Sequence, residues 1–201
     1  MEIILIRHFM TRGNQKHRYI GTTDEPLLKG QAWESAGTDR SCAAGYPDVQ
    51  AVAVSPLKRC VETANIIYPG VRRVVCSDLR ECDFGLFENK SYEELKDDPD
   101  YQRWIKSGGT LPFPGGEARD VFCERSVRGF VSVTERFLKE NVRSAAFVVH
   151  GGTIMAILDR FAHHEEGFYH WQVRNREGYR AKLNKEQWQS GVRRLTEIER
   201  L

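Results

Sequence analysis

The stretch Ile3-Ile4-Leu5-Ile6-Arg7-His8 decides the fold, because an apolar run of four residues ends abruptly in a cation and an imidazole. A short run of branched apolar residues is typical of a strand that is buried on both faces. Open α/β folds bind their ligands at the carboxyl ends of such strands. The stretch therefore predicts a buried strand that delivers Arg7 and His8 to a ligand site.

The same pattern occurs twice more along the chain. Residues 51–54 form an apolar run that ends in Ser55, with Arg59 four residues later, and residues 146–149 form one that ends in His150-Gly151-Gly152. The carboxyl ends of neighbouring parallel strands lie at one edge of a sheet, so two histidines and two arginines are expected together there. This concentration of positive charge predicts an anionic ligand, and phosphate is the first candidate.

Composition limits the possible functions. The 201 residues suffice for one α/β domain, and their 30 basic and 28 acidic side chains are mixed along the chain to a net charge of +2. The first apolar run is too short for a signal peptide or a membrane span. We therefore expect a cytoplasmic protein that binds neither nucleic acid nor a membrane. The five cysteines lack metal-ligand spacing and are expected to be reduced: Cys42, Cys60, Cys76, Cys82 and Cys123.

Short apolar runs alternate with helical stretches, which predicts parallel strands joined by crossover helices. The expected strands are residues 3–6, 51–54, 73–76 and 146–149, with a late edge strand at 179–183. The expected helices cover 28–44, 56–67, 127–138 and 153–161, and the second has Ser55 as its N-cap and Pro56 at its first position. Residues 82–116 interrupt the alternation and are expected to form a small lid over the site, within a single domain of residues 1–201.

These residue types suit phosphoryl transfer. Neutral imidazole attacks phosphorus readily, so His8 is the expected nucleophile. The planar guanidiniums of Arg7 and Arg59 suit the charge that builds on the phosphoryl oxygens. His150 and the backbone of Gly151, at the start of a helix, are expected to bind the same phosphoryl group. The arginines and histidines supply the positive charge, so no metal or other cofactor is expected.

A leaving alcohol also needs a proton, which a carboxylic acid in apolar surroundings can supply. Glu81 follows the third strand and fits that task, with Asp83 as the competing candidate.

The aromatic residues of the insertion could form a wall for a substrate or could simply pack the lid. They are Phe84, Phe87, Tyr92, Tyr101 and Trp104. The other histidines have no comparable setting and are expected to be exposed or buried in the core: His17, His163, His164 and His170.

Five ordered blocks of the chain together resemble the histidine phosphatase superfamily, which has the phosphoglycerate mutase-like fold. The blocks are residues 5–14 with Thr11 and Asn14, 18–32, 55–64, 79–85 and 149–152. The resemblance implies a three-layer α/β/α sandwich with a mostly parallel sheet. It also implies that His8 becomes phosphorylated, that Arg7, Arg59 and His150 bind the phosphoryl group, that Glu81 donates the proton, and that Asn14 lines the phosphate pocket.

One departure from the family's pattern concerns the residues after His8. The family usually continues with Gly-Glu-Thr, whereas this chain has Phe9-Met10-Thr11. We expect Phe9 to shape the leaving-group site, where its ring could narrow the pocket or offer a stacking face.

Within the superfamily, residues 83–90, 104–105 and 111–117 look most like bacterial α-ribazole phosphatases, which act late in cobalamin assembly. The first expectation is therefore a metal-independent phosphomonoesterase that acts on a small intracellular phosphate ester such as α-ribazole 5′-phosphate. The alternatives are a cofactor-dependent phosphoglycerate mutase and a non-catalytic module that binds a phospholigand. The sequence does not indicate an oligomeric state.

Overall fold

The computed structural model describes residues 1–29, 45–163 and 167–201. The helix expected over 28–44 lies outside the described residues except for its first two positions, and Cys42 and His164 also lie outside them. The four cysteines within the described residues are free thiols. No helix among the described residues is long and apolar enough to cross a membrane.

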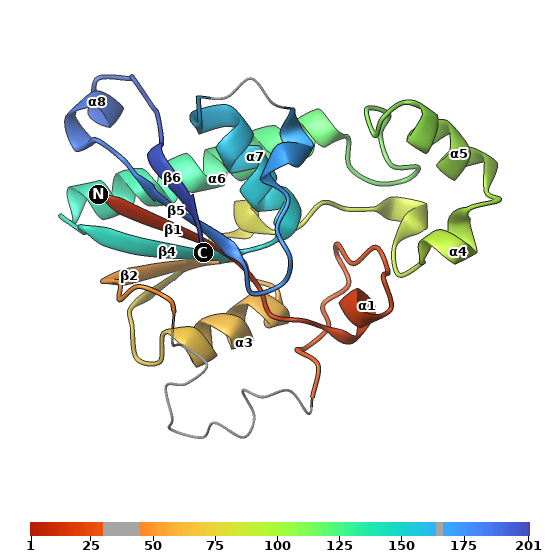
Figure 1. Ribbon diagram of the computed structural model, residues 1–201, viewed down its shortest axis with the longest axis horizontal. Helices are drawn as coiled ribbons and strands as arrows, with labels where there is room; N and C mark the ends of the chain where they lie inside the picture. The colour runs from red at the N-terminus through yellow and green to blue at the C-terminus, as the bar shows by residue number, and fades with distance from the viewer. Residues whose placement is uncertain (30–44, 164–166) are drawn as a thin grey trace.

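A single six-stranded sheet in the order β3-β2-β4-β1-β5-β6 forms the middle layer (Figure 1). Its parallel part contains β1 (Glu2–Arg7), β2 (Ala51–Val54), β3 (Arg73–Val75) and β4 (Ser144–Val149). The strands expected from the apolar runs are thus present, each within about two residues of its predicted ends.

Helices cover both faces of this sheet (Figure 1). On one face lie α6 (Arg119–Lys139) and α7 (Gly151–Phe161), and on the other lies α3 (Lys58–Ile67). Successive side chains of a strand point to opposite faces, so Ile3 and Leu5 pack with the α6 and α7 residues while Ile4 and Ile6 pack with those of α3. The mostly parallel three-layer α/β/α sandwich is confirmed.

The antiparallel part of the sheet differs from the prediction. The late strand β5 (Gly178–Lys182) pairs antiparallel with β1 and is not an edge, because β6 (Thr196–Arg200) pairs with its other side. Between these strands lies α8 (Lys185–Gln189), whose Trp188 is buried in the core. Residues 196–200 are mostly polar and exposed, so no apolar pattern in the sequence indicated β6.

The start of α3 also differs from the prediction. The helix begins at Lys58 rather than at Pro56, and its N-cap residue, Leu57, makes no side-chain capping bond. The Ser55 hydroxyl accepts a long local hydrogen bond from the backbone N–H of Leu57 (3.4 Å) and lies closer to the imidazole of His150 (2.8 Å). The side chain that the sequence assigned to a helix cap is therefore also engaged by a tertiary contact.

The region after β3 lies beyond the carboxyl edge of the sheet (Figure 1). It contains the short helices η2 (Ser77–Leu79), η3 (Gly85–Phe87), α4 (Tyr92–Leu95) and α5 (Pro99–Lys106). Residues 82–116, which we call the lid, have their own hydrophobic cluster around Phe87, Tyr101 and Phe113. At its base the backbone approaches Gly85 so closely that an added Cβ would lie 2.2 Å from the carbonyl oxygen of Pro114.

Candidate active site

The sheet register brings three polar strand ends together. In the parallel ladder Arg7 is opposite Val149, and Val54 is opposite Val148. His8, Ser55 and His150 are the next residues on β1, β2 and β4, so all three lie at the same edge. The imidazole rings of His8 and His150 are 5.2 Å apart between centroids.

His8 is held in the form that a nucleophile needs. Its Nδ1 donates to the carbonyl oxygen of Phe9 at 2.7 Å, and because a carbonyl can only accept, the proton lies on Nδ1 and the lone pair on Nε2. The side chain is only 3% exposed. Burial, and then the charges of Arg59 and Arg7, lower the pKa of His8 well below its usual value. The imidazole is therefore neutral near neutral pH.

His150 is fixed by partners on both nitrogens. Arg59 Nε donates to its Nδ1 at 3.3 Å, which leaves the proton on Nε2, and Nε2 lies 2.8 Å from the Ser55 hydroxyl. Burial and the neighbouring Arg59 hold the pKa of His150 well below its ordinary range. Ser55 therefore sets the tautomer and orientation of this ring, a role that the sequence did not indicate.

The two arginines differ in their surroundings. Arg59 is fully buried, and its guanidinium donates to the carbonyl oxygens of Thr23 (2.7 Å) and Gly21 (2.8 Å). Arg7 donates to Val173 through Nη1 at 2.7 Å, while its buried Nε has no partner among the described residues. Arg7 lines a cavity at this edge and keeps a donor available for a ligand.

The carboxyl group of Glu81 lies at the same cavity. Its two oxygens accept hydrogen bonds from the backbone N–H groups of Cys82 (3.0 Å) and Gly152 (3.3 Å). Burial raises the pKa of Glu81 despite these bonds and the nearby arginines. Asp83 does not line the cavity, and its Oδ1 accepts from the backbone of Gly85 at 2.9 Å. The geometry therefore favours Glu81 over Asp83 as a proton donor.

Two further expected residues lie at the cavity or beside it. Asn14 lines the cavity from α1 (Arg12–Gln15), and its Oδ1 accepts from Asn175 at 3.1 Å. Gly151 is the first residue of α7, and a Cβ added there would lie 3.5 Å from the guanidinium of Arg7. Gly151 thus places the first turn of the helix beside this cation, and a Cβ would also fit there at an ordinary contact distance.

The structure corrects the expectation for Phe9. Its side chain is fully buried in the core layer between the sheet and α3, under the guanidinium of Arg176, and does not line the cavity. The next residue, Met10, lines the cavity instead.

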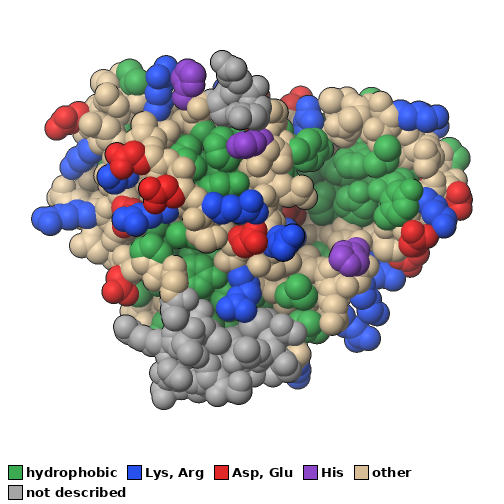
Figure 2. Space-filling model, viewed as in Figure 1, with side chains coloured by type: hydrophobic (Ala, Val, Ile, Leu, Met, Phe, Trp, Pro, Cys, Tyr) green, Lys and Arg blue, Asp and Glu red, His purple; other side chains and the backbone are tan. Residues whose placement is uncertain are grey.

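The cavity has a volume of about 780 Å³ and extends from Arg7 and Glu81 to the lid. Figure 2 shows hydrophobic side chains gathered in a hollow beside the lid. Of the lid aromatics, Phe84 and Trp104 line this cavity, whereas Phe87 and Tyr101 are buried inside the lid. Two of these expected rings thus line the cavity, and two pack the interior of the lid.

Several residues that line the cavity were missed by the sequence analysis. Arg174 and Asn175 precede β5, and Asn175 also donates to the carbonyl oxygen of His8 at 3.0 Å. The antiparallel pairing of β5 with β1 brings its amino end to this edge, and no local signal reveals that pairing. The exposed His17 also lies at the cavity, and the aromatic wall is completed by Tyr19, Phe113, Phe122, Phe168 and Tyr169.

The arrangement combines a neutral imidazole whose lone pair lies on Nε2, a carboxyl group with a raised pKa, and the guanidiniums of Arg7 and Arg59, which can neutralise an oxyanion. Within the described ranges, no three histidine, cysteine, aspartate or glutamate side chains are grouped so that they could hold a metal ion.

Comparison with known proteins gives a consistent relationship. A family model described as the histidine phosphatase superfamily, branch 1, matches residues 3–195. The chain is 33% identical over 131 residues to the "Bifunctional protein Rv2228c" of Mycobacterium tuberculosis, a match that covers 63% of this chain and 35% of that protein. The chain thus spans about a third of the length of that relative.

Two other similarities are to a curated relative and to a solved structure. The "Probable phosphoglycerate mutase GpmB" of Klebsiella pneumoniae is 29% identical over 142 residues, which make up 67% of this chain and 64% of that protein. The crystal structure of the alpha-ribazole phosphatase from Shigella flexneri superposes with a TM-score of 0.76 at 22% identity, over 92% of this chain and 91% of that one. The latter similarity shows the fold alone.

Proposed function

This chain belongs to the histidine phosphatase superfamily, branch 1, and from that premise we propose that it is a metal-independent phosphomonoesterase working through a phosphohistidine at His8. The whole chain acts as one domain, and the lid contributes to substrate binding. The observation that carries the proposal is the state of His8, a neutral imidazole whose Nδ1 donates its proton to the Phe9 carbonyl and whose lone pair lies on Nε2.

In the first step the Nε2 lone pair of His8 attacks phosphorus and the bond to the ester oxygen breaks. The protonated carboxyl of Glu81 gives its proton to the departing alcohol. In the second step the Glu81 carboxylate takes a proton from water, the water oxygen attacks phosphorus, and the P–N bond breaks to release phosphate and neutral His8. Arg7, Arg59 and His150 lie beside the reacting phosphoryl group, with Asn14 and the backbone of Gly151, and the cations stabilise its charge.

We further propose that the substrate is a small intracellular ester with a flat aromatic group, such as α-ribazole 5′-phosphate. The cavity supports this choice, because its Glu81 end suits a phosphoryl group and its opposite wall contains Phe84, Trp104 and Phe113. Aromatic rings of a protein stack on planar heterocycles with useful affinity. The fold shared with an α-ribazole phosphatase is a second, independent support.

The test is phosphate release from α-ribazole 5′-phosphate in the presence of EDTA, with His8→Ala measured beside the wild type. Rapid release that resists the chelator and vanishes in the variant is the expected result. If the wild type releases phosphate from p-nitrophenyl phosphate but not from α-ribazole 5′-phosphate, the mechanism stands and the substrate is a different ester.

A phosphoglycerate mutase is the second candidate, favoured by the similarity to the GpmB protein. Such an enzyme must retain its phosphohistidine against water and pass the phosphoryl group to a second hydroxyl. Dependence of 3-phosphoglycerate conversion on 2,3-bisphosphoglycerate, with little phosphate released, would identify this activity.

A further inference from the structure

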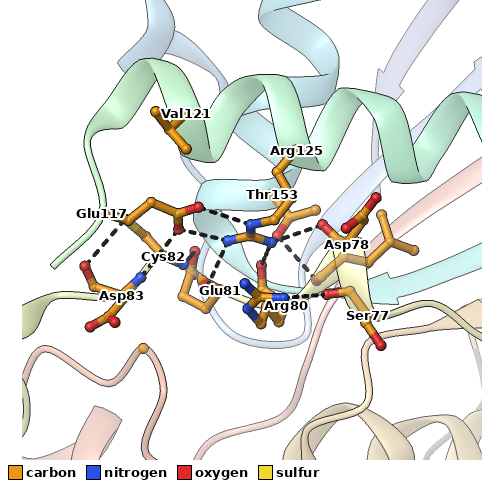
Figure 3. A network of polar contacts seen from close by, with 12 residues as sticks. Ser77, Asp78, Arg80, Glu81, Cys82, Asp83, Glu117, Val121, Arg125 and Thr153 are labelled. Carbon is orange, nitrogen blue, oxygen red and sulfur yellow. Dashed lines mark hydrogen bonds and ion pairs between the residues drawn. The ribbon is translucent and has the colours of Figure 1, made fainter.

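An arginine lies behind Glu81, outside the cavity. Arg125 projects from α6 and is only 5% exposed, and its guanidinium carbon lies 5.3 Å from the ring centroid of Phe122. Its Nη1 donates to the carbonyl oxygens of Asp78 (2.9 Å) and Arg80 (3.0 Å), and its Nη2 donates to that of Glu81 (3.2 Å). Figure 3 shows this one guanidinium connected to the main chain on the amino side of Glu81.

The other edge of the same guanidinium is bound by Glu117. Arg125 Nε and Nη2 donate to the two carboxylate oxygens of Glu117 at 2.9 and 2.7 Å, a bidentate pair that is nearly buried. The backbone N–H of Glu117 donates to the carbonyl oxygen of Asp83 at 2.9 Å (Figure 3). The ion pair is therefore connected to the main chain on both sides of Glu81.

The segment that carries Glu81 needs such support. Residues 80–84 lie between η2 and η3 and belong to no helix or strand, so no ladder of backbone hydrogen bonds holds them. Five N–H donors in a rigid plane can fix several acceptors at once, which an ammonium group cannot do. A displacement of about 1 Å in a group that transfers a proton can cost about 100-fold in rate.

We propose that Arg125, with its charge balanced by Glu117, is a positioning residue that holds the main chain of Glu81 so that the carboxyl group reaches the leaving oxygen. This inference rests on the proposed role of Glu81 as proton donor. Arg125 does not line the cavity and touches no reacting group.

The test compares two esters that differ in their need for a proton donor. Hydrolysis of β-glycerol phosphate needs protonation of a poor leaving group, whereas p-nitrophenyl phosphate departs with little help. Because Arg125→Met leaves the buried Glu117 without its partner and can unfold the protein, the main variant is Arg125→Met with Glu117→Met, which removes both charges. The matched control is Arg128→Met, since Arg128 is an exposed arginine of the same helix that binds the Asp78 side chain at 3.0 Å.

In the double variant kcat/KM for β-glycerol phosphate, which reports transfer of the phosphoryl group to His8, should fall about 10- to 100-fold, and kcat/KM for p-nitrophenyl phosphate should fall by less than about 3-fold. The triple variant that also carries Glu81→Gln should be no slower on β-glycerol phosphate than Glu81→Gln alone, because both changes act through one proton transfer. Arg128→Met should match the wild type on both esters.

Equal losses on the two esters, no loss on either, or losses that multiply with Glu81→Gln would overturn the inference. Glu81→Gln alone separates this failure from a failure of the proposed function. If it lowers kcat/KM only for β-glycerol phosphate while the double variant does not, the positioning role alone is wrong. If it lowers kcat/KM for both esters equally, Glu81 is not the donor and both proposals fall.

Discussion

The edge of the sheet and the lid above it are built by different means. At the sheet edge, His8, Arg59 and His150 are polar side chains at most 3% exposed, fixed by carbonyl oxygens, a hydroxyl and one another. In the lid, aromatic rings pack edge to face, as between Phe87 and Tyr101 at 5.2 Å. A network of buried hydrogen bonds tolerates little change, whereas apolar packing accepts different side chains of similar volume.

The difference separates the chemistry from the recognition of the leaving group. Changes at the sheet edge should affect every phosphate ester, because each substrate presents the same phosphoryl group there. Changes on the inner wall of the lid should affect only esters large enough to reach it. The following predictions test that separation, beginning with the largest expected effect.

Replacement of His8 should abolish turnover of all esters. His8→Ala removes the nucleophile, so kcat for α-ribazole 5′-phosphate, p-nitrophenyl phosphate and β-glycerol phosphate should each fall by about 10⁴-fold or more. The control is His170→Ala, which changes an exposed histidine that does not line the cavity. A loss confined to one ester would contradict a shared nucleophile.

The pH dependence should follow the two shifted groups. Catalysis needs neutral His8, whose lowered pKa keeps it neutral above its usual value of about 6.5 and well below it. It also needs protonated Glu81, whose pKa is raised by burial, so kcat/KM should fall as the pH rises through that pKa. Glu81→Gln should lower kcat/KM for β-glycerol phosphate about 100-fold and remove this alkaline decline. If the alkaline decline persists in the Glu81→Gln variant, another group causes it.

A change on the lid wall should be selective. Trp104→Ala removes a ring that lines the cavity, so kcat/KM for α-ribazole 5′-phosphate should fall about 10-fold, equivalent to about 1.4 kcal/mol of lost stacking, while β-glycerol phosphate is hydrolysed as before. Tyr92→Ala is the control, because Tyr92 is an exposed lid aromatic that does not line the cavity. Equal losses on both substrates would place Trp104 in the chemical step.

Phe9 should influence stability without affecting selectivity. Since its ring is fully buried against core residues, Phe9→Ala should lower the free energy of unfolding by about 3 to 5 kcal/mol. The ratio of kcat/KM between α-ribazole 5′-phosphate and β-glycerol phosphate should stay within about 2-fold of the wild-type ratio, because repacking of the core shifts the cavity only slightly. Denaturant unfolding measures the change in stability, and kinetics on the folded fraction measure the ratio. A changed ratio would show that Phe9 shapes the leaving-group site after all.

The sequence predicts the sheet edge well because its signals are local. Each buried strand is a continuous apolar run, and the residue that follows it must lie at the carboxyl edge, so Arg7, His8 and His150 could be placed without a structure. The same reasoning fails for Phe9, since strand periodicity no longer applies one residue beyond the strand.

Residues that depend on tertiary pairing escaped prediction. Ser55 was assigned to a local cap, but the imidazole of His150 engages it from a neighbouring strand. Asn175 reaches the site only because β5 runs antiparallel to β1. Arg125 and Glu117 are eight residues apart, and the sequence does not distinguish them from ordinary surface charges. In the folded chain Glu117, which follows the lid, lies beside α6 and forms a buried ion pair with Arg125. Such contacts join separate elements and leave no periodic pattern.

The most direct test of the account is mass spectrometry of the peptide that contains His8, taken from Glu81→Gln protein denatured at alkaline pH during turnover of p-nitrophenyl phosphate. The variant still accepts the phosphoryl group from a good leaving group but lacks the base that activates water, so the intermediate should accumulate. The account predicts one phosphoryl group on His8 and none in the His8→Ala protein. Phosphate release without a phosphorylated His8, or a phosphoryl group on another residue, would contradict it.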